Sequence, residues 1–267
     1  MSPRPARSAA VGAALLALIL APLVGAPGVA NADTTCNGQI ASIAGSPGVT
    51  LTGTAGDDVI LTKGAARVDS GAGDDSICVT GKGTAVVNAG PGDDFVGARA
   101  HRGKTFVSLG FGDDRFLGGT GADRVWSQEA SNQSSPDDDD VIITGDGDDY
   151  VISGSSAAAN HDVVDLGPGN DALVTYGSTV GASLTGGVGA NTLQPLFNSE
   201  DVGEWTIDNT TGRADLNGTN RLSWASFQRF DLTGLQGALT RYLGSAASEW
   251  VVAGGTCRVV LRGRGAR

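Results

Sequence analysis

Carboxylate pairs recur along this chain in a fixed, glycine-rich setting. The tripeptide Gly-Asp-Asp occurs five times and Gly-Asn-Asp once. The second acids of these six copies are Asp58, Asp75, Asp94, Asp114, Asp149 and Asp171. An apolar residue follows each second acid by two positions, and a further glycine usually lies four positions before it. Acids repeated in this way are suited to binding hard cations, which prefer oxygen ligands.

A nine-residue phase joins these copies. Residues 118–126 read Gly-Gly-Thr-Gly-Ala-Asp-Arg-Val-Trp and form a complete nonapeptide, nine residues after the Asp114 copy. The additional acids that keep this phase are Asp123, Asp140 and Asp162. Degenerate copies have Ala66, Ala85 and Thr105 at the acid position. We therefore expect coils of two nonapeptides, or 17 to 22 residues. One expected nonapeptide position, near Asn132, is lost.

The elements that position these acids follow from the glycines and the apolar residues. Glycine tolerates positive φ, so each glycine-rich stretch can turn tightly. The triplet after the acid then forms a short strand whose middle side chain enters the core. Stacked coils place equivalent turns about 4.8 Å apart. The predicted fold class is all-β, a parallel β-roll or β-helix solenoid with a β-rich C-terminal cap.

Two rows of turns are expected, one along each edge of the solenoid. The first row is predicted to hold Asp58, Asp75, Asp94 and Asp114, then a gap, then Asp149, Asp171 and Asn191. The second is predicted to hold Ala66, Ala85, Thr105, Asp123, Asp140 and Asp162. The turn glycines of the sites are Gly56, Gly73, Gly92, Gly112, Gly121, Gly147 and Gly169. We expect weaker sites in the second row, because insertions disturb its spacing.

The nonapeptides resemble the repeats-in-toxin, or hemolysin-type, calcium-binding repeats, over roughly residues 36–195. The resemblance implies a parallel β-roll that binds calcium between its turns. The opening residues from Cys36 and the pair Ile77-Cys78 also look like small exported actinobacterial members of this group. The chain departs from the toxins in having an N-terminal export signal and in lacking the acid in half of its nonapeptides.

The physics of the turns supports calcium independently of the resemblance. Two neighbouring turns offer backbone carbonyls and two carboxylates around one cavity. Ca²⁺ takes about 6–8 oxygen ligands and suits such a cage better than the strictly octahedral Mg²⁺. The alternative is a metal-free β-helix with solvated acidic turns, since Gly-Asp turns are common. The first acid of each pair and the run Asp137–Asp139 are expected to face solvent.

The two ends of the chain differ from the repeats. Arg4 and Arg7 precede an apolar run, and Ala30-Asn31-Ala32 is a small-residue cleavage site, so residues 1–32 are predicted to be a signal peptide of a secreted protein. Residues 33–195 are assigned to the repeats, and residues 196–267 to a β-rich cap and basic tail. No later segment is apolar enough to span a membrane.

Cysteine usage predicts one disulfide. An exported chain meets oxidising conditions, and three cysteines leave one unpaired. Cys78 follows the core residue Ile77 at the side of the solenoid, and Cys36 begins the mature chain. We predict a Cys36–Cys78 bridge, formed by an N-terminal segment that folds down, with Cys257 free. Three unpaired thiols are the alternative.

Composition and charge restrict the function. Residues 33–204 hold 25 acidic and 8 basic residues, which disfavours a nucleic-acid partner. His101 and His161 are the only histidines, and neither an H-E-x-x-H nor a G-x-S-x-G motif occurs. We expect a secreted calcium-binding repeat protein with a structural or adhesive role, not an enzyme, with cell-surface carbohydrate or protein as possible partners. A secreted carbohydrate-active enzyme of the lyase or epimerase type is the alternative.

Overall fold

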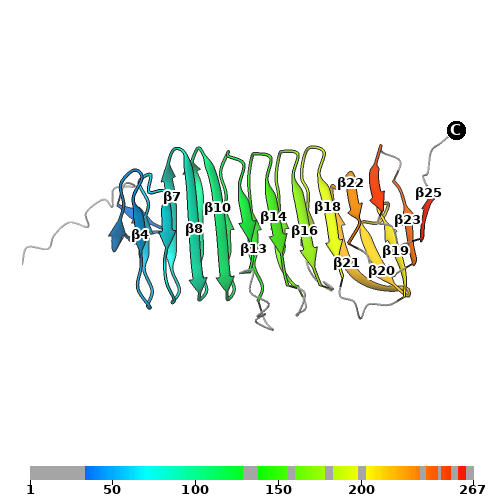
Figure 1. Ribbon diagram of the computed structural model, residues 1–267, viewed down its shortest axis with the longest axis horizontal. Helices are drawn as coiled ribbons and strands as arrows, with labels where there is room; N and C mark the ends of the chain where they lie inside the picture. Colours follow the sequence, from blue (N-terminus) through cyan, green and yellow to red (C-terminus); the bar gives the residue numbers. More distant parts are fainter. Residues whose placement is uncertain are drawn as a thin grey trace, which may run out of the picture. The chain divides into compact units, whose positions relative to one another are not determined.

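The chain forms an all-β solenoid of about nine turns, as predicted (Figure 1). This computed structural model describes residues 34–128, 138–155, 160–177, 183–197, 203–234, 239–245, 248–253 and 258–262. The predicted signal peptide, Asn132 and Cys257 lie outside these residues. Within them every regular element is a strand. In the same ranges no helix has the length and apolar character needed to cross a membrane.

Two long sheets form the walls of the solenoid. The ten-stranded sheet contains β4 (Thr50–Thr52), β6 (Arg67–Asp69), β8 (Thr84–Pro91), β10 (Lys104–Phe111), β12 (Arg124–Trp126), β14 (Tyr150–Ser153), β16 (Ala172–Tyr176), β18 (Thr192–Leu196), β22 (Arg229–Leu232) and β24 (Trp250–Ala253), in that order. The thirteen-stranded sheet contains β3 (Ile43–Ala44), β5 (Val59–Leu61), β7 (Ser76–Gly81), β9 (Phe95–His101), β11 (Arg115–Leu117), β13 (Val141–Ile143), β15 (Val163–Asp165), β17 (Ser183–Thr185), β21 (Thr219–Ala225), β20 (Arg213–Leu216), β19 (Glu204–Asp208), β23 (Leu239–Leu243) and β25 (Arg258–Arg262). From β3 to β18 the chain alternates between the two sheets, and each strand pairs in parallel with its counterpart one coil away.

The core lies between these sheets and is built from the middle residue of each triplet. Ile60, Ile77, Val96, Phe116 and Ile142 align in register along the thirteen-stranded sheet, and each is fully buried. Successive side chains of a strand point to opposite faces, so one residue of each triplet enters the core while its neighbours face outward. The predicted inward positions are therefore confirmed.

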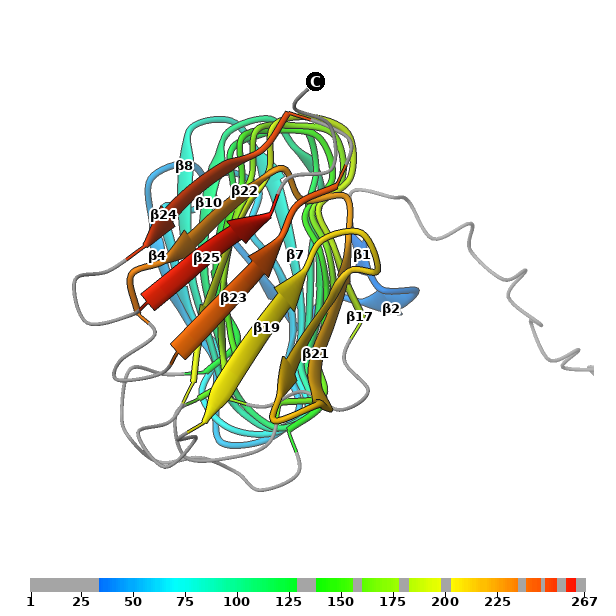
Figure 2. The same cartoon turned by 90° about the vertical axis from the view of Figure 1, so that its right-hand side faces the viewer.

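The C-terminal strands close one end of the solenoid. Strands β19, β20 and β21 form an antiparallel meander within the thirteen-stranded sheet, and β23 and β25 then extend it in parallel from β19. Viewed from this end, β19, β23 and β25 fan across the opening between the two walls (Figure 2). Trp205 is buried there and stacks on Phe197 with ring centroids 3.7 Å apart. The extra antiparallel strands give this sheet the width to cover the core.

A separate hairpin lies at the other end of the described residues. Strands β1 (Thr35–Cys36) and β2 (Gln39–Ile40) pair antiparallel through a turn in which Asn37 and Gly38 adopt positive φ. Strand β1 contacts β5 and β7 of the thirteen-stranded sheet. The hairpin thus rests against the first coils and does not continue them.

Candidate metal-binding turns

The in-phase acids of the first edge form one unbroken hydrogen-bonded ladder. Each acid directly precedes a strand of the thirteen-stranded sheet. In every member but the last, the backbone N–H donates to Oδ1 of the equivalent acid in the next coil, with donor–acceptor distances of 2.7 to 3.1 Å. The acids in this ladder, which we call the first ladder, are Asp58, Asp75, Asp94, Asp114, Asp140 and Asp162.

The second edge carries a shorter ladder of the same design. Thr105 N–H donates to Oδ1 of Asp123 at 3.2 Å, and the pattern then repeats from coil to coil. The members of this second ladder are Asp123, Asp149, Asp171 and Asn191, with N–H to Oδ1 distances of 2.7 to 3.0 Å. The N–H of Asn191 ends the ladder on Oε1 of Gln228, at 2.9 Å.

The predicted assignment of the acids to rows was wrong after Asp123. Asp140 and Asp162 continue the first edge from Asp114, and Asp149 and Asp171 continue the second from Asp123. Asp114 and Asp140 are 26 residues apart, but this long coil still contributes one strand to each sheet. No strand position is lost. The additional residues are inserted between β12 and β13, and the chain still alternates between the two sheets.

The predicted site glycines stack on one another along the same two edges. Gly112 has φ 123°, and a Cβ atom there would lie 2.3 Å from the carbonyl oxygen of Gly92. Gly73 packs on Gly56, Gly92 on Gly73, Gly147 on Gly121, and Gly169 on Gly147 in the same way. Only glycine permits both the positive φ at Gly112 and this backbone approach. The turns therefore bring carbonyl oxygens of successive coils close together.

The second carboxylate oxygen distinguishes most ladder acids from three of the four ladder ends. Oδ2 is buried and accepts no hydrogen bond in the interior acids and in Asp123, which begins the second ladder: Asp75, Asp94, Asp114, Asp123, Asp140, Asp149 and Asp171. These side chains are at most 2% exposed. A buried carboxylate oxygen without a partner is costly. Each of these oxygens therefore requires a proton or a cation.

Both ends of the first ladder, and the far end of the second, are satisfied within the protein. The Thr54 N–H and hydroxyl donate to Oδ2 of Asp58 at 2.7 and 2.9 Å, and the Ser153 hydroxyl donates to Oδ2 of Asp162 at 2.6 Å. Asn191 replaces the acid at the far end of the second ladder. Its Nδ2 donates to the carbonyl oxygen of Gly186 at 2.6 Å. An amide group thus supplies a donor where an acid would have only an acceptor.

Burial dominates the electrostatics of the ladders. It raises the pKa of Asp94, Asp123 and Asp171 to about 7 and that of Asp114 to about 9. Burial also raises the pKa of Asp75, where a nearby Ser70 side chain partly offsets the effect. The neighbouring carboxylates raise the pKa values further, for example Asp75 acting on Asp94. The metal-free site therefore favours uptake of positive charge.

The first acids of the pairs are exposed, as predicted, but they have a structural role that the sequence analysis missed. Oδ1 of Asp57 accepts the N–H of Asp74 at 3.0 Å, and Asp74 and Asp93 accept from the next coils in turn. This outer ladder runs in the opposite direction to the inner one, because here the N–H of the later coil donates to the earlier acid. The recurring Asp-Asp dipeptide was the sequence feature that could have indicated this outer ladder.

Asp138 is a buried acid outside the predicted set. It was assigned to a solvated run, but it is 6% exposed and accepts a hydrogen bond from Nε2 of Gln128 at 2.8 Å. Burial raises its pKa to about 7. Asp138 lies two residues before Asp140, where every other ladder copy but that of Asp162 has glycine, and this departure from the motif could have identified it. Asp137 lies outside the described residues.

The donor set limits how a metal ion could be bound. Among the described residues, no three His, Cys, Asp or Glu side chains gather in a metal-binding cluster. A cation in these turns would therefore take carboxylate oxygens from two adjacent coils and complete its shell with backbone carbonyls. This is the ligand set that the motif predicts, and it matches the oxygen preference of Ca²⁺.

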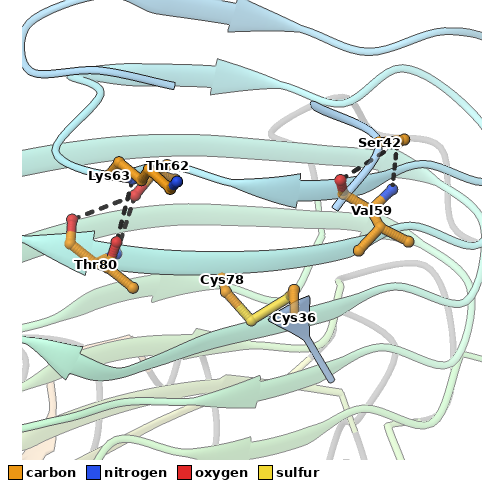
Figure 3. The surroundings of a disulfide bond; sticks show 7 residues. All are labelled: Cys36, Ser42, Val59, Thr62, Lys63, Cys78 and Thr80. Atoms are coloured by element: carbon orange, nitrogen blue, oxygen red, sulfur yellow. Dashed lines mark hydrogen bonds between the residues drawn. A yellow bond between two sulfur atoms is a disulfide. The ribbon is translucent and has the colours of Figure 1, made fainter. Parts of the chain in front are cut away.

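The predicted disulfide is confirmed. Cys36 and Cys78 are bridged, with their Cα atoms 5.4 Å apart. Figure 3 shows Cys36 on β1 directed toward Cys78, which faces outward from β7 because Ile77 faces the core. The expected two-coil gap is closed because the hairpin folds back onto β5 and β7. Nearby, Thr80 N–H donates to Thr62 Oγ1 at 2.9 Å and ties these strands together.

Comparison with known proteins adds no relative. No family model, no curated protein sequence and no solved structure matches this chain.

Proposed function

We propose that this protein is an exported calcium-binding repeat protein that holds Ca²⁺ between adjacent turns of its two ladders. The observation that carries the proposal is the set of buried, unpartnered Oδ2 atoms in the ladder interiors. Neutral donors satisfy Oδ2 of Asp58 and Asp162 at the ends of the first ladder, whereas Oδ2 of the acids between them has none. Cations between the coils would neutralise the stacked carboxylates and use the adjacent glycine carbonyls.

The repeats are proposed to be of the hemolysin type that the sequence resembles. The resemblance assigns calcium to turns of this composition, and the stacked glycines provide the close backbone approach that such turns need. The disulfide supports export to an oxidising compartment. The proposed role is structural or adhesive, with calcium stiffening a rod that contacts carbohydrate or protein at a cell surface.

Calcium titration of the chelated protein tests the proposal. We expect millimolar calcium at pH 7.5 to raise the melting temperature and increase the far-ultraviolet β-signal cooperatively, whereas magnesium does so weakly. In the competing explanation the buried acids are simply protonated. In that case calcium leaves both the spectrum and the melting temperature unchanged, and the proposal is wrong.

A matched pair of variants tests the site. Asp94→Asn removes a buried ladder carboxylate but keeps the shape of the side chain, and Asp93→Asn removes the exposed acid beside it. By isothermal titration calorimetry we expect Asp94→Asn to lose at least one bound calcium or to weaken it about tenfold, since ligand charge sets calcium affinity. Asp93→Asn should bind nearly as the wild type does. Equal losses would show that diffuse negative charge attracts the ion.

A further inference from the structure

A pocket lies on the outer face of the thirteen-stranded sheet, and no ladder acid lines it. Its volume is about 300 Å³, and its lining is predominantly apolar. The floor is one in-register row that crosses four coils: Leu61, Cys78, Gly97 and Leu117. Leu61 and Leu117 are 3% and 8% exposed although neither belongs to the main core. The outer face therefore carries a second, small apolar cluster.

Gly97 lets the Phe95 ring pack against this row. Its neighbours in register are Cys78 and Leu117, so the ring lies against the one position of the row without a side chain. A Cβ atom at Gly97 would lie 3.0 Å from the Phe95 ring and 4.0 Å from Sγ of Cys78. Beside it, the register of β7 and β9 shifts between Cys78 and Thr80. Such irregularities redirect side chains and are frequent beside binding sites.

The N-terminal hairpin supplies one wall. Thr35 and Asn37 of the hairpin line the pocket, and the Cys36–Cys78 disulfide attaches them to the floor. The wall is thus held covalently to the sheet that it faces. This converts an exposed sheet surface into a concave site that is preformed.

The charge at the rim identifies the class of ligand. Arg99 is exposed and is the charged side chain among the lining residues, which include no acid. No carboxylate of the described chain lies within ion-pair distance of its guanidinium. An arginine without a partner beside an apolar pocket suits a carboxylate, which it can bind through two parallel hydrogen bonds. Pockets of this kind, apolar with few polar groups, bind small ligands.

We propose that this pocket binds a small amphipathic carboxylate, with its apolar body against Leu61, Leu117 and the Phe95 ring and its head group on Arg99. A volume of 300 Å³ accommodates about ten groups of the size of a water molecule. A straight-chain acid of about eight carbons has this size. The site is independent of the ladders, so it can be tested whether or not calcium proves to be their ligand.

Octanoate is the probe, with 1-octanol as its uncharged counterpart. Wild-type protein in millimolar calcium is titrated by calorimetry and by saturation-transfer NMR, and its fold is checked by circular dichroism. We expect saturable binding of one octanoate and at least tenfold weaker binding of 1-octanol. Absence of octanoate binding, or equal binding of the two compounds, would overturn the proposal.

Three variants locate the site. Arg99→Gln should weaken octanoate about tenfold, since hydrogen bonds to charged groups are the stronger ones. Gly97→Val should abolish binding, because the added side chain would displace the Phe95 ring that lines the pocket. Arg67→Gln removes an exposed arginine from the opposite sheet and should leave binding unchanged. If Gly97→Val changes the spectrum, Arg99→Gln decides alone, and an unaltered affinity in that variant sinks the proposal.

Discussion

The two edges of the solenoid are built from the same nonapeptide, yet their first coils stack differently. On the first edge, from Asp58 on, the N–H of the acid donates to a side chain of the next coil. On the second edge the same position is Ala85 or Thr105, which lie inside strands and pair in register with each other. Strand length does not follow the acid, because β8 and β10 have eight residues but β6, which follows Ala66, has three. On the first edge β7 and β9, which follow Asp75 and Asp94, have six and seven.

This difference shows what the acids contribute. Without an acid, the chain extends the sheet through ordinary backbone hydrogen bonds and brings no charge into the turn. With an acid, the carboxylate replaces a backbone partner and leaves a second oxygen buried beside the turn. The acid-free turns stack without a buried carboxylate, whereas most of the acid-bearing turns bury a carboxylate oxygen that has no donor. The acids are therefore unnecessary for coiling, and the calcium binding proposed above would account for their presence.

The largest expected effect is that of pH on the metal-free protein. Burial raises the pKa of Asp94 to about 7 and of Asp114 to about 9, above the ordinary value of 3.8. A raised pKa in the folded state stabilises the fold at low pH, and this contribution is lost as pH rises through the folded pKa. We therefore expect the melting temperature in chelator to fall between pH 5 and pH 9.

Amide hydrogen exchange at pH 9 then compares the two edges. Turns around Asp75 and Asp94 should exchange faster than the equivalent positions around Ala66 and Ala85. A melting temperature that is constant or rises with pH would contradict the electrostatic difference between the edges.

Reduction of the disulfide should have the next largest effect. The bridge lies at the first coils, in which the second edge has Ala66 and Ala85 at its acid positions. Bridging Cys36 and Cys78 closes 42 residues of sequence. Reducing a bridge of this span is expected to cost about 2–4 kcal/mol of stability. Since no ladder carboxylate is involved, the loss should be similar with and without calcium. A loss seen only in chelator would mean that the bridge and the ladder act as one unit.

The smallest effect is expected from Asn191→Asp at the end of the second ladder. This change replaces the Nδ2 donor to Gly186 by a carboxylate oxygen, as in the ladder interior. In chelator at pH 8 it should destabilise the fold by about 1–3 kcal/mol, the cost of a buried group without a partner. Chemical denaturation measures this, with the exposed Asn170→Asp as control. Equal effects of the two changes would remove the distinction between the inner and outer positions.

Much of the architecture followed from local pattern. The spacing of the glycines, acids and apolar residues was enough to predict the coils and the inward residues such as Ile60 and Phe116, because turn conformation and strand alternation are local properties. The Cys36–Cys78 bridge was also predictable, since export and the outward direction of Cys78 were readable. Which acids pair after Asp114 was not predictable. An insertion there changes the number of residues between acids, although the strands still alternate between the two sheets.

The sequence by itself determined where the acids lie within each repeat and that they line the edges of a solenoid. Only the tertiary structure decided which acids face one another, which oxygens have donors and which residues line a pocket. Asp58 and Asp94 share one motif, yet a hydroxyl from Thr54 satisfies the first while the second has no donor. The reason is physical: a buried carboxylate needs hydrogen-bond donors or cations beside it, and the groups that surround it are positioned by how the coils stack.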